Sequence, residues 1–170
     1  MKYTSAEAAK ILRQLNEDYN ALYRMESQSM DFVAALNEDI ESVRPEYDYA
    51  ETQKKLAELE DKIRTVKHAI NVFNSTHVIP EFNMTIDQML IYLPQLSQRK
   101  DKLYRMKNRL PKTRERSSGS GSNIIDYRIV NYDIAAAEAD YNEAAVLLSK
   151  AQTALDVINT TETMDLDIEI

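Results

Sequence analysis

The sequence predicts a mainly α-helical fold, in which four long amphipathic helices pack as an antiparallel coiled coil or bundle with a small β element at one end. Two observations predict it. In four separate segments, apolar residues recur at alternating steps of three and four, which is the period of an amphipathic helix. The four segments also have matched lengths of about 25 residues, on the order of 37 Å of helix, so neighbours can pack along their whole length.

The first two helices are expected over residues 5–29 and 49–73. Thr4 followed by Glu7 has the spacing of a capping box, in which each side chain binds the backbone N–H of the other residue. Asp48 is the corresponding cap of the second helix. The apolar positions are Ala8, Leu12, Leu15, Tyr19 and Leu22 in the first helix, and Leu56, Leu59, Ile63, Val66, Ile70 and Phe73 in the second.

The third and fourth helices are expected over residues 85–109 and 134–158. Thr85 and Asp133 are their capping residues. Pro94 lies inside the third helix, where it removes a backbone hydrogen bond, so we expect a kink or a later start there. The apolar positions are Ile86, Met89, Leu93, Leu96, Leu103 and Leu110 in the third helix, and Ile134, Ala137, Tyr141, Ala144, Leu148, Ala151, Leu155 and Ile158 in the fourth.

The residues that close two of these helices are expected to be asparagines. Asn74 and Asn159 each follow the last apolar position of a helical segment. Asparagine is the usual substitute for glycine in the left-handed conformation that ends many helices. We therefore interpret both as caps.

Short extended segments are expected between the helices and at the C-terminal end. Four stretches have the apolar or alternating pattern of strands, namely residues 30–36, 77–82, 124–131 and 164–170. The last of them is hypothesised to add a strand to a neighbouring copy. Residues 111–123, which contain SGSGS, are expected to form a flexible loop because of their glycine and serine content.

Several stretches, taken in order along the chain, resemble a small family of bacterial proteins, some of which are labelled septicolysin-like. They are LAELEDKIRTVKHAINVFNSTH, MTIDQML with LSQRKDKL, NIIDYRIVNYDIAAAEADY and LDVINTTETMDLDI. The similarity spans most of the chain. It implies a helical protein with a minor β element, and it assigns no activity and no site residue.

The charges are distributed unevenly. The chain has 21 basic and 28 acidic side chains and a formal net charge of −7, which argues against a general affinity for nucleic acid. Between residues 99 and 116, however, nine basic residues face only two acidic ones, so this segment carries +7 and the remainder −14. The candidate polyanion-binding residues, called the basic strip below, are Arg99, Lys102, Arg105, Lys107, Arg109, Lys112, Arg114 and Arg116.

Two interpretations of the basic strip compete. It could bind phosphate groups, with an affinity that falls steeply as salt rises. Alternatively, its cations lie near a helix C-terminus, where the helix dipole favours them, and acidic faces of the same or another chain neutralise them. The second interpretation is favoured, and nucleic acid is the less favoured partner.

No catalytic, cofactor or metal signature is found. The SGSGS stretch could also be a phosphate loop, but no lysine follows its glycines and the next expected element is a strand. Neither His68 nor His77 has a glutamate three residues before it, as helical metal sites usually require. Glu38, Asp39 and Glu41 could supply paired carboxylates, but such clusters are more often solvated loops. The sequence therefore predicts no enzyme, no cofactor and no metal.

The sequence has the character of a cytoplasmic, self-associating protein. It has no cysteine, and it has no apolar run of the roughly 20 residues that a membrane span requires. Its N-terminal residues become charged and polar too early for a secretory signal. We expect one helical domain over residues 1–170 that forms a homo-oligomer, with polyanion binding as the alternative function.

Overall fold

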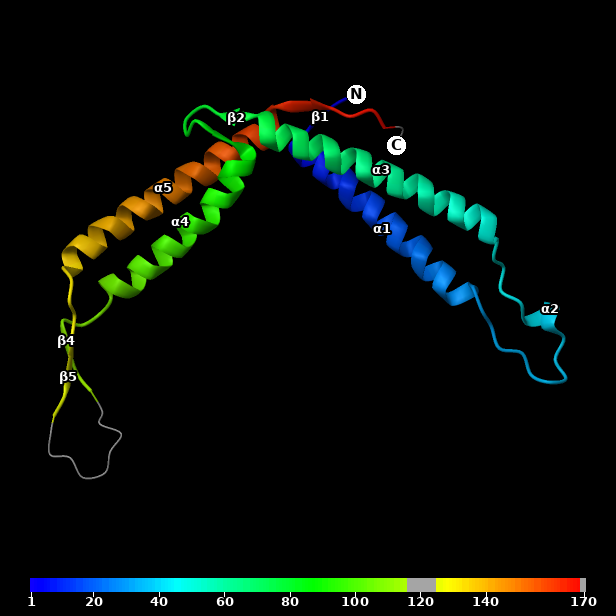
Figure 1. Cartoon of the computed structure of the whole chain (residues 1–170), viewed down its shortest axis with the longest axis horizontal. Coiled ribbons are helices and arrows are strands. Elements are labelled where there is room, and N and C mark those ends of the chain that lie inside the picture. The colour runs from blue at the N-terminus through cyan, green and yellow to red at the C-terminus, as the bar shows by residue number, and fades with distance from the viewer. Residues whose placement is uncertain (116–124, 169–170) are drawn as a thin grey trace. The chain divides into compact units, whose positions relative to one another are not determined.

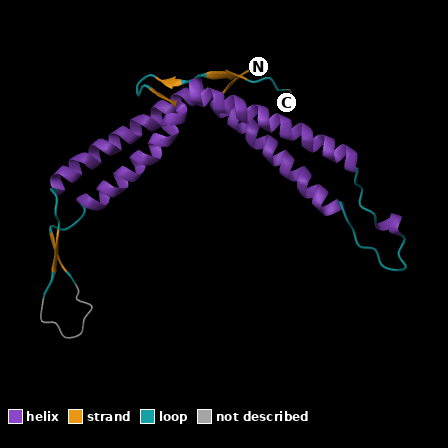
Figure 2. Cartoon of the chain, in the orientation of Figure 1, coloured by secondary structure: helices purple, strands orange, loops and turns teal. Residues whose placement is uncertain are grey.

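The computed structural model describes residues 1–115 and 125–168 and is mainly helical, as the sequence predicts (Figures 1 and 2). Contacts divide the chain into two compact units, which are described separately. Unit 1 comprises Met1–His77 and Val157–Ile170, and unit 2 comprises Val78–Asp156. The single domain expected over residues 1–170 stays a prediction.

Unit 1 is built on two long antiparallel helices, α1 (Ser5–Ser29) and α3 (Tyr49–Thr76), which lie side by side (Figure 1). Both begin at the predicted caps, and the capping box of α1 is formed on both sides. The Tyr19 hydroxyl donates to Glu60 at 3.1 Å across the pair. Among its described residues, the buried apolar ones are Ala8, Leu15, Leu56, Val66, Phe73, Ile158, Met164 and Leu166.

The two ends of the chain are joined in unit 1. Strand β1 (Lys2–Thr4) pairs antiparallel with β6 (Thr163–Asp165). The Met1 amino group donates to the Leu166 carbonyl and the Leu166 N–H donates to the Met1 carbonyl, each at 2.9 Å. The C-terminal segment thus has a pairing partner in its own chain, and its pairing with a neighbouring copy stays a prediction. Residues 166–168 lie outside the strand, and 169–170 lie outside the described residues.

The loop between α1 and α3 contains one short helix, α2 (Ile40–Val43), and no strand. The strand expected over residues 30–36 is therefore wrong. An extended segment is stable only when its backbone has a partner, and here the Ala35 N–H bonds the Glu38 side chain instead. The apolar side chains of Phe32, Val33 and Leu36 are exposed and do not form the buried face of a sheet.

Unit 2 contains α4 (Ile86–Lys107) and most of α5 (Ile134–Thr161), which run antiparallel and side by side (Figure 1). Nine of the predicted apolar positions are buried, namely Ile86, Met89, Leu96, Leu103, Ala137, Ala144, Leu148, Ala151 and Leu155. Leu110, by contrast, follows the end of α4 and is 68% exposed. Helix α4 begins at Ile86 and continues past Pro94 to Lys107, so the later start expected there is wrong, and the kink stays a prediction. The ring removes one backbone bond, and the neighbouring turns hold the helix.

Two short antiparallel pairs complete unit 2. Strands β2 (Val78–Ile79) and β3 (Met84–Thr85) flank a turn in which Asn83 has a φ of 50°. Strands β4 (Lys112–Arg114) and β5 (Tyr127–Ile129) form a ribbon. The expectations of strands within 77–82 and 124–131 are thus met only in part. The loop expected over 111–123 contains β4, and its residues 116–123, like residue 124, lie outside the described part of the chain.

The two asparagines that were predicted to end helices lie inside them, so this prediction is wrong. Asn74 lies inside α3, which ends at Thr76, and Asn159 lies inside α5, which ends at Thr161. The hydroxyls of Thr76 and Thr161 each donate to a valine carbonyl four residues earlier. These added turns are polar, so an apolar periodicity does not detect them.

The capping box at the start of α4 gives a first prediction. The Gln88 N–H donates to the Thr85 hydroxyl at 3.2 Å, and the Thr85 N–H donates to the Gln88 side chain at 2.9 Å. Thr85→Ala is expected to lower the free energy of unfolding by about 1 kcal/mol, because two helix N-terminal bonds lose their geometry. The exposed change Gln98→Ala in the same helix is the control, with an expected effect within about 0.5 kcal/mol. Equal shifts in urea denaturation followed by circular dichroism would contradict the prediction.

Candidate functional site

The basic strip is distributed over three parts of unit 2. Arg99, Lys102, Arg105 and Lys107 lie on α4, Arg109 follows the helix, and Lys112 and Arg114 lie in β4. Arg116 lies outside the described residues. Successive helix residues are separated by about 100°, so Arg99 and Arg105 point about 120° apart around α4. The strip is therefore several separate sites and not one continuous track.

One member of the strip is engaged at the junction of the two helices. The Lys107 ammonium is 3.4 Å from the Glu138 carboxylate and 4.3 Å from the centre of the Tyr141 ring. Its side chain is only 19% exposed. Tyr104 packs against the same ring at 5.9 Å, and the Tyr132 hydroxyl donates to the Met106 carbonyl at 2.8 Å. Lys107 thus has the role that the favoured interpretation gave it, as a cation at a helix C-terminus opposite an acidic helix.

The β4–β5 ribbon has charged contacts on its surface. The Lys112 ammonium lies 4.0 Å from the centre of the Tyr127 ring. Arg128 donates two hydrogen bonds of 2.8 Å to the Glu115 carboxylate. These bonds lower the pKa of Glu115 and raise that of Arg128. Sequence reasoning missed Arg128, because only the pairing of β5 with β4, in which Arg128 lies opposite Thr113, brings its side chain within reach of Glu115.

The pH dependence of the ribbon follows from the two hydrogen bonds between Arg128 and Glu115. The folded pKa of Glu115 lies below its ordinary value of 4.5. The two bonds therefore stabilise the ribbon fully above pH 4.5, and this stabilisation is lost as the pH falls through the folded pKa. An NMR titration of the Thr113 and Arg128 amides is expected to show the ribbon loosening only at acidic pH. Glu115→Gln should remove that step, and a titration unchanged by the substitution would contradict the prediction.

A groove of about 360 Å³ lies between α4 and α5. Arg99 and Lys102 line it from α4, and Asp140 and Glu143 line it from α5. Its apolar lining consists of Leu103, Ala144 and Leu147. Among the described residues, none of the four charged groups forms an ion pair within 4 Å. We call this the α4–α5 groove.

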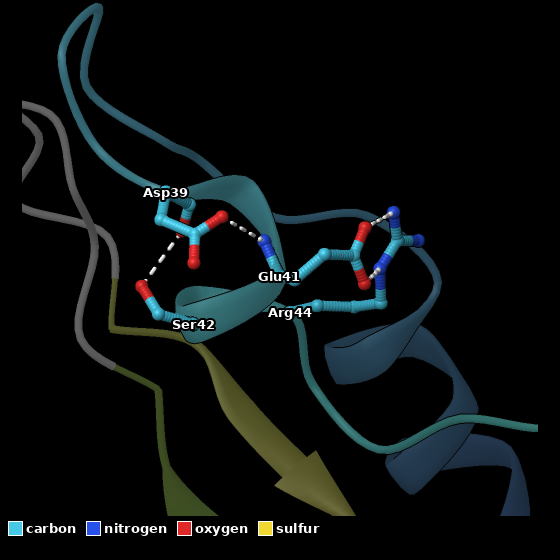
Figure 3. A network of polar contacts seen from close by, with 4 residues as sticks. All are labelled: Asp39, Glu41, Ser42 and Arg44. Atoms are coloured by element: carbon cyan, nitrogen blue, oxygen red, sulfur yellow. Dashed lines mark hydrogen bonds and ion pairs between the residues drawn. The ribbon is translucent and has the colours of Figure 1, made fainter.

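The loop between α1 and α3 contains a polar network (Figure 3). The Asp39 carboxylate accepts from the Glu41 N–H at 3.3 Å, and the Ser42 hydroxyl donates to the Asp39 carbonyl at 2.7 Å. Glu41 accepts two bonds from Arg44, whose guanidinium lies 5.5 Å from the centre of the Phe32 ring. These carboxylates hold the short helix α2, which fits the interpretation of the cluster as a loop.

The described residues contain no group of three or more metal-binding side chains that could hold an ion. His77 stacks on Phe73 with ring centres 4.8 Å apart, and His68 lies exposed on α3. None of the helices in the described part of the chain combines the length and the apolar character of a membrane span.

The fold defines a mainly helical protein that exposes charged and apolar side chains. No protein-family model and no curated protein sequence matches the chain. Among solved structures, it is similar to a functionally unknown conserved protein from Corynebacterium diphtheriae, with a TM-score of 0.60 and 18% sequence identity. The match covers 97% of this chain and 100% of the other. At this identity the likeness shows a shared fold.

Proposed function

We propose that this chain is a cytoplasmic, non-enzymatic helical protein that acts by association, above all with copies of itself. The observation that carries the proposal is the apolar surface that the two helix pairs leave exposed. Among the described residues, twenty large apolar side chains are exposed, whereas eighteen apolar residues are buried and four of those are alanine. A helix pair buries one seam, so the remaining apolar surface is available to a partner.

The accessible surface of the chain supports the same proposal. The chain exposes 12622 Å², whereas a compact monomer of 19.6 kDa exposes about 8,600 Å². Two separate compact domains of half that mass would together expose only about 10,300 Å². The accessible surface of the chain thus exceeds that of both compact references. Association with further helices would bury the excess.

Light scattering coupled to size-exclusion chromatography tests the proposal. The expected result is a mass at least twice 19.6 kDa at micromolar concentration, with dissociation on dilution. A mass of one chain at every concentration would overturn it. The absence of cysteine fits a reducing compartment, and the septicolysin-like resemblance supports a bacterial helical protein.

Polyanion binding is the second candidate function. The observation that favours it is the exposure of Arg105, Arg109 and Arg114, which form no ion pair within the part of the chain that the structure describes. Arg114 lies on a two-stranded ribbon, and such ribbons enter nucleic-acid grooves in several protein classes. Lysine and arginine that contact phosphate release counterions, so binding would weaken steeply with salt.

A salt titration distinguishes this candidate. The double variant Arg105→Ala with Arg109→Ala is expected to lower the slope of log affinity against log salt by about 2. The control is Lys54→Ala with Lys67→Ala, two exposed α3 residues whose loss changes the net charge equally. No retention of DNA or RNA at low salt, or the same loss in both double variants, would dismiss the candidate.

A further inference from the structure

The α4–α5 groove belongs to a longer face of unit 2. Steps of three and four place further α4 residues on the same side of the helix as Arg99 and Lys102. These are Gln88, Tyr92 and Gln95, which with Ile91 line a second hollow. On α5, a third hollow shares Glu143 and Leu147 with the groove and adds Val146 and Lys150. The exposed apolar residues of this face are therefore continuous with the groove.

The two rims of the groove carry opposite charges at the same level. The contact between Lys107 and Glu138 fixes the register of the antiparallel helices. Because both helices rise equally per residue, moving five residues back along α4 and five forward along α5 places Lys102 level with Glu143. The α4 rim is therefore basic and the α5 rim acidic, above an apolar floor.

We propose that a second copy of this chain occupies the α4–α5 groove, related by a two-fold axis that runs along it. Such a rotation lays α4 of each copy over α5 of the other and leaves every residue at its own level along the axis. Lys102 then faces Glu143 of the second copy, and Arg99 faces the same acidic rim. All four helices have antiparallel neighbours, which is the arrangement of a four-helix bundle.

The size of the face is adequate for a stable dimer. Helix α4 has 22 residues and is therefore about 33 Å long, and two helices side by side are about 20 Å wide. This footprint of roughly 660 Å² approaches the 800 Å² or so that each partner buries in a standard protein interface. The exposed side chains of Ile91 and Val146 would add apolar contacts beside the charged rims. The inference rests on the proposed self-association and names the surface that performs it.

Charge reversal tests the proposal. One variant, Arg99→Glu with Lys102→Glu, makes both rims acidic, and the other, Asp140→Lys with Glu143→Lys, makes both basic. Each alone is expected to dimerise about 100-fold more weakly, because like charges then face each other across the interface. An equimolar mixture of the two is expected to dimerise again, since each acidic rim then meets a basic one. Only contacts between chains can be restored by mixing.

The quadruple variant that exchanges all four charges is the control for folding. It keeps opposite rims within and between copies, and it is expected to dimerise as the wild type does. The measurement is sedimentation velocity at low ionic strength, with circular dichroism melts of every variant. If the wild type associates and both rim variants associate equally well, the groove is not the interface, although self-association stands. A mixture that stays monomeric overturns the inference as well, whereas a monomeric wild type overturns the proposed function itself.

Discussion

Leu166→Ala is expected to lower the free energy of unfolding of unit 1 by about 2–5 kcal/mol, although the residue lies four positions from the C-terminus. Its side chain is only 2% exposed, and its backbone bonds the Met1 backbone in both directions. The substitution removes buried apolar volume in a unit with a single seam, where few neighbours can move to fill a cavity. Hydrogen exchange of peptides from α1 and α3 measures the loss of stability in unit 1.

Asp167→Ala is the matched control for Leu166→Ala. Asp167 is the next residue along the same segment, and its side chain is exposed. Its replacement is expected to change the stability by no more than about 0.5 kcal/mol. If both substitutions leave the exchange of α1 and α3 unchanged, the C-terminal segment does not contribute to unit 1, and the pairing of β1 with β6 is not a stabilising element.

The sequence predicted the helices well because their signals are local. Thr4, Asp48 and Thr85 each lie directly before a helix and bind its first N–H groups, so the start of the helix can be read from one short stretch. The seam residues follow from periodicity, and Val66 and Leu96 are buried as their spacing predicts. Capping and periodicity need no knowledge of distant residues.

The strands were predicted less well because pairing is not local. Residues 30–36 have the composition of a strand but find no partner, whereas β1 was missed although it pairs with β6 across the length of the chain. Alternation of apolar residues indicates that a segment is suited to one buried face, but it does not say which segment lies beside it. The same reason explains why β4 was missed inside an expected loop.

Only the basic half of the candidate site was predicted from the sequence. Arg99 and Lys102 were identified from the local excess of basic residues, but the carboxylates of Asp140 and Glu143 were not. They lie on another helix, and only the register between α4 and α5 brings them to the same level. The register is a property of the packed pair, so the apolar pattern of one helix alone does not reveal it.

Leu96→Ala in α4 is expected to destabilise unit 2 by about 2–5 kcal/mol, because Leu96 is 1% exposed in the middle of the seam with α5. Leu90→Ala is the matched control, since it removes the same atoms from the same helix at a site that is 47% exposed. Its expected cost is below about 1 kcal/mol. Hydrogen exchange of α4 and α5 peptides separates this unit from unit 1, which should keep its protection in both variants. A larger loss from Leu90→Ala than from Leu96→Ala would mean that the apolar surface carrying Leu90 is covered by a partner in solution.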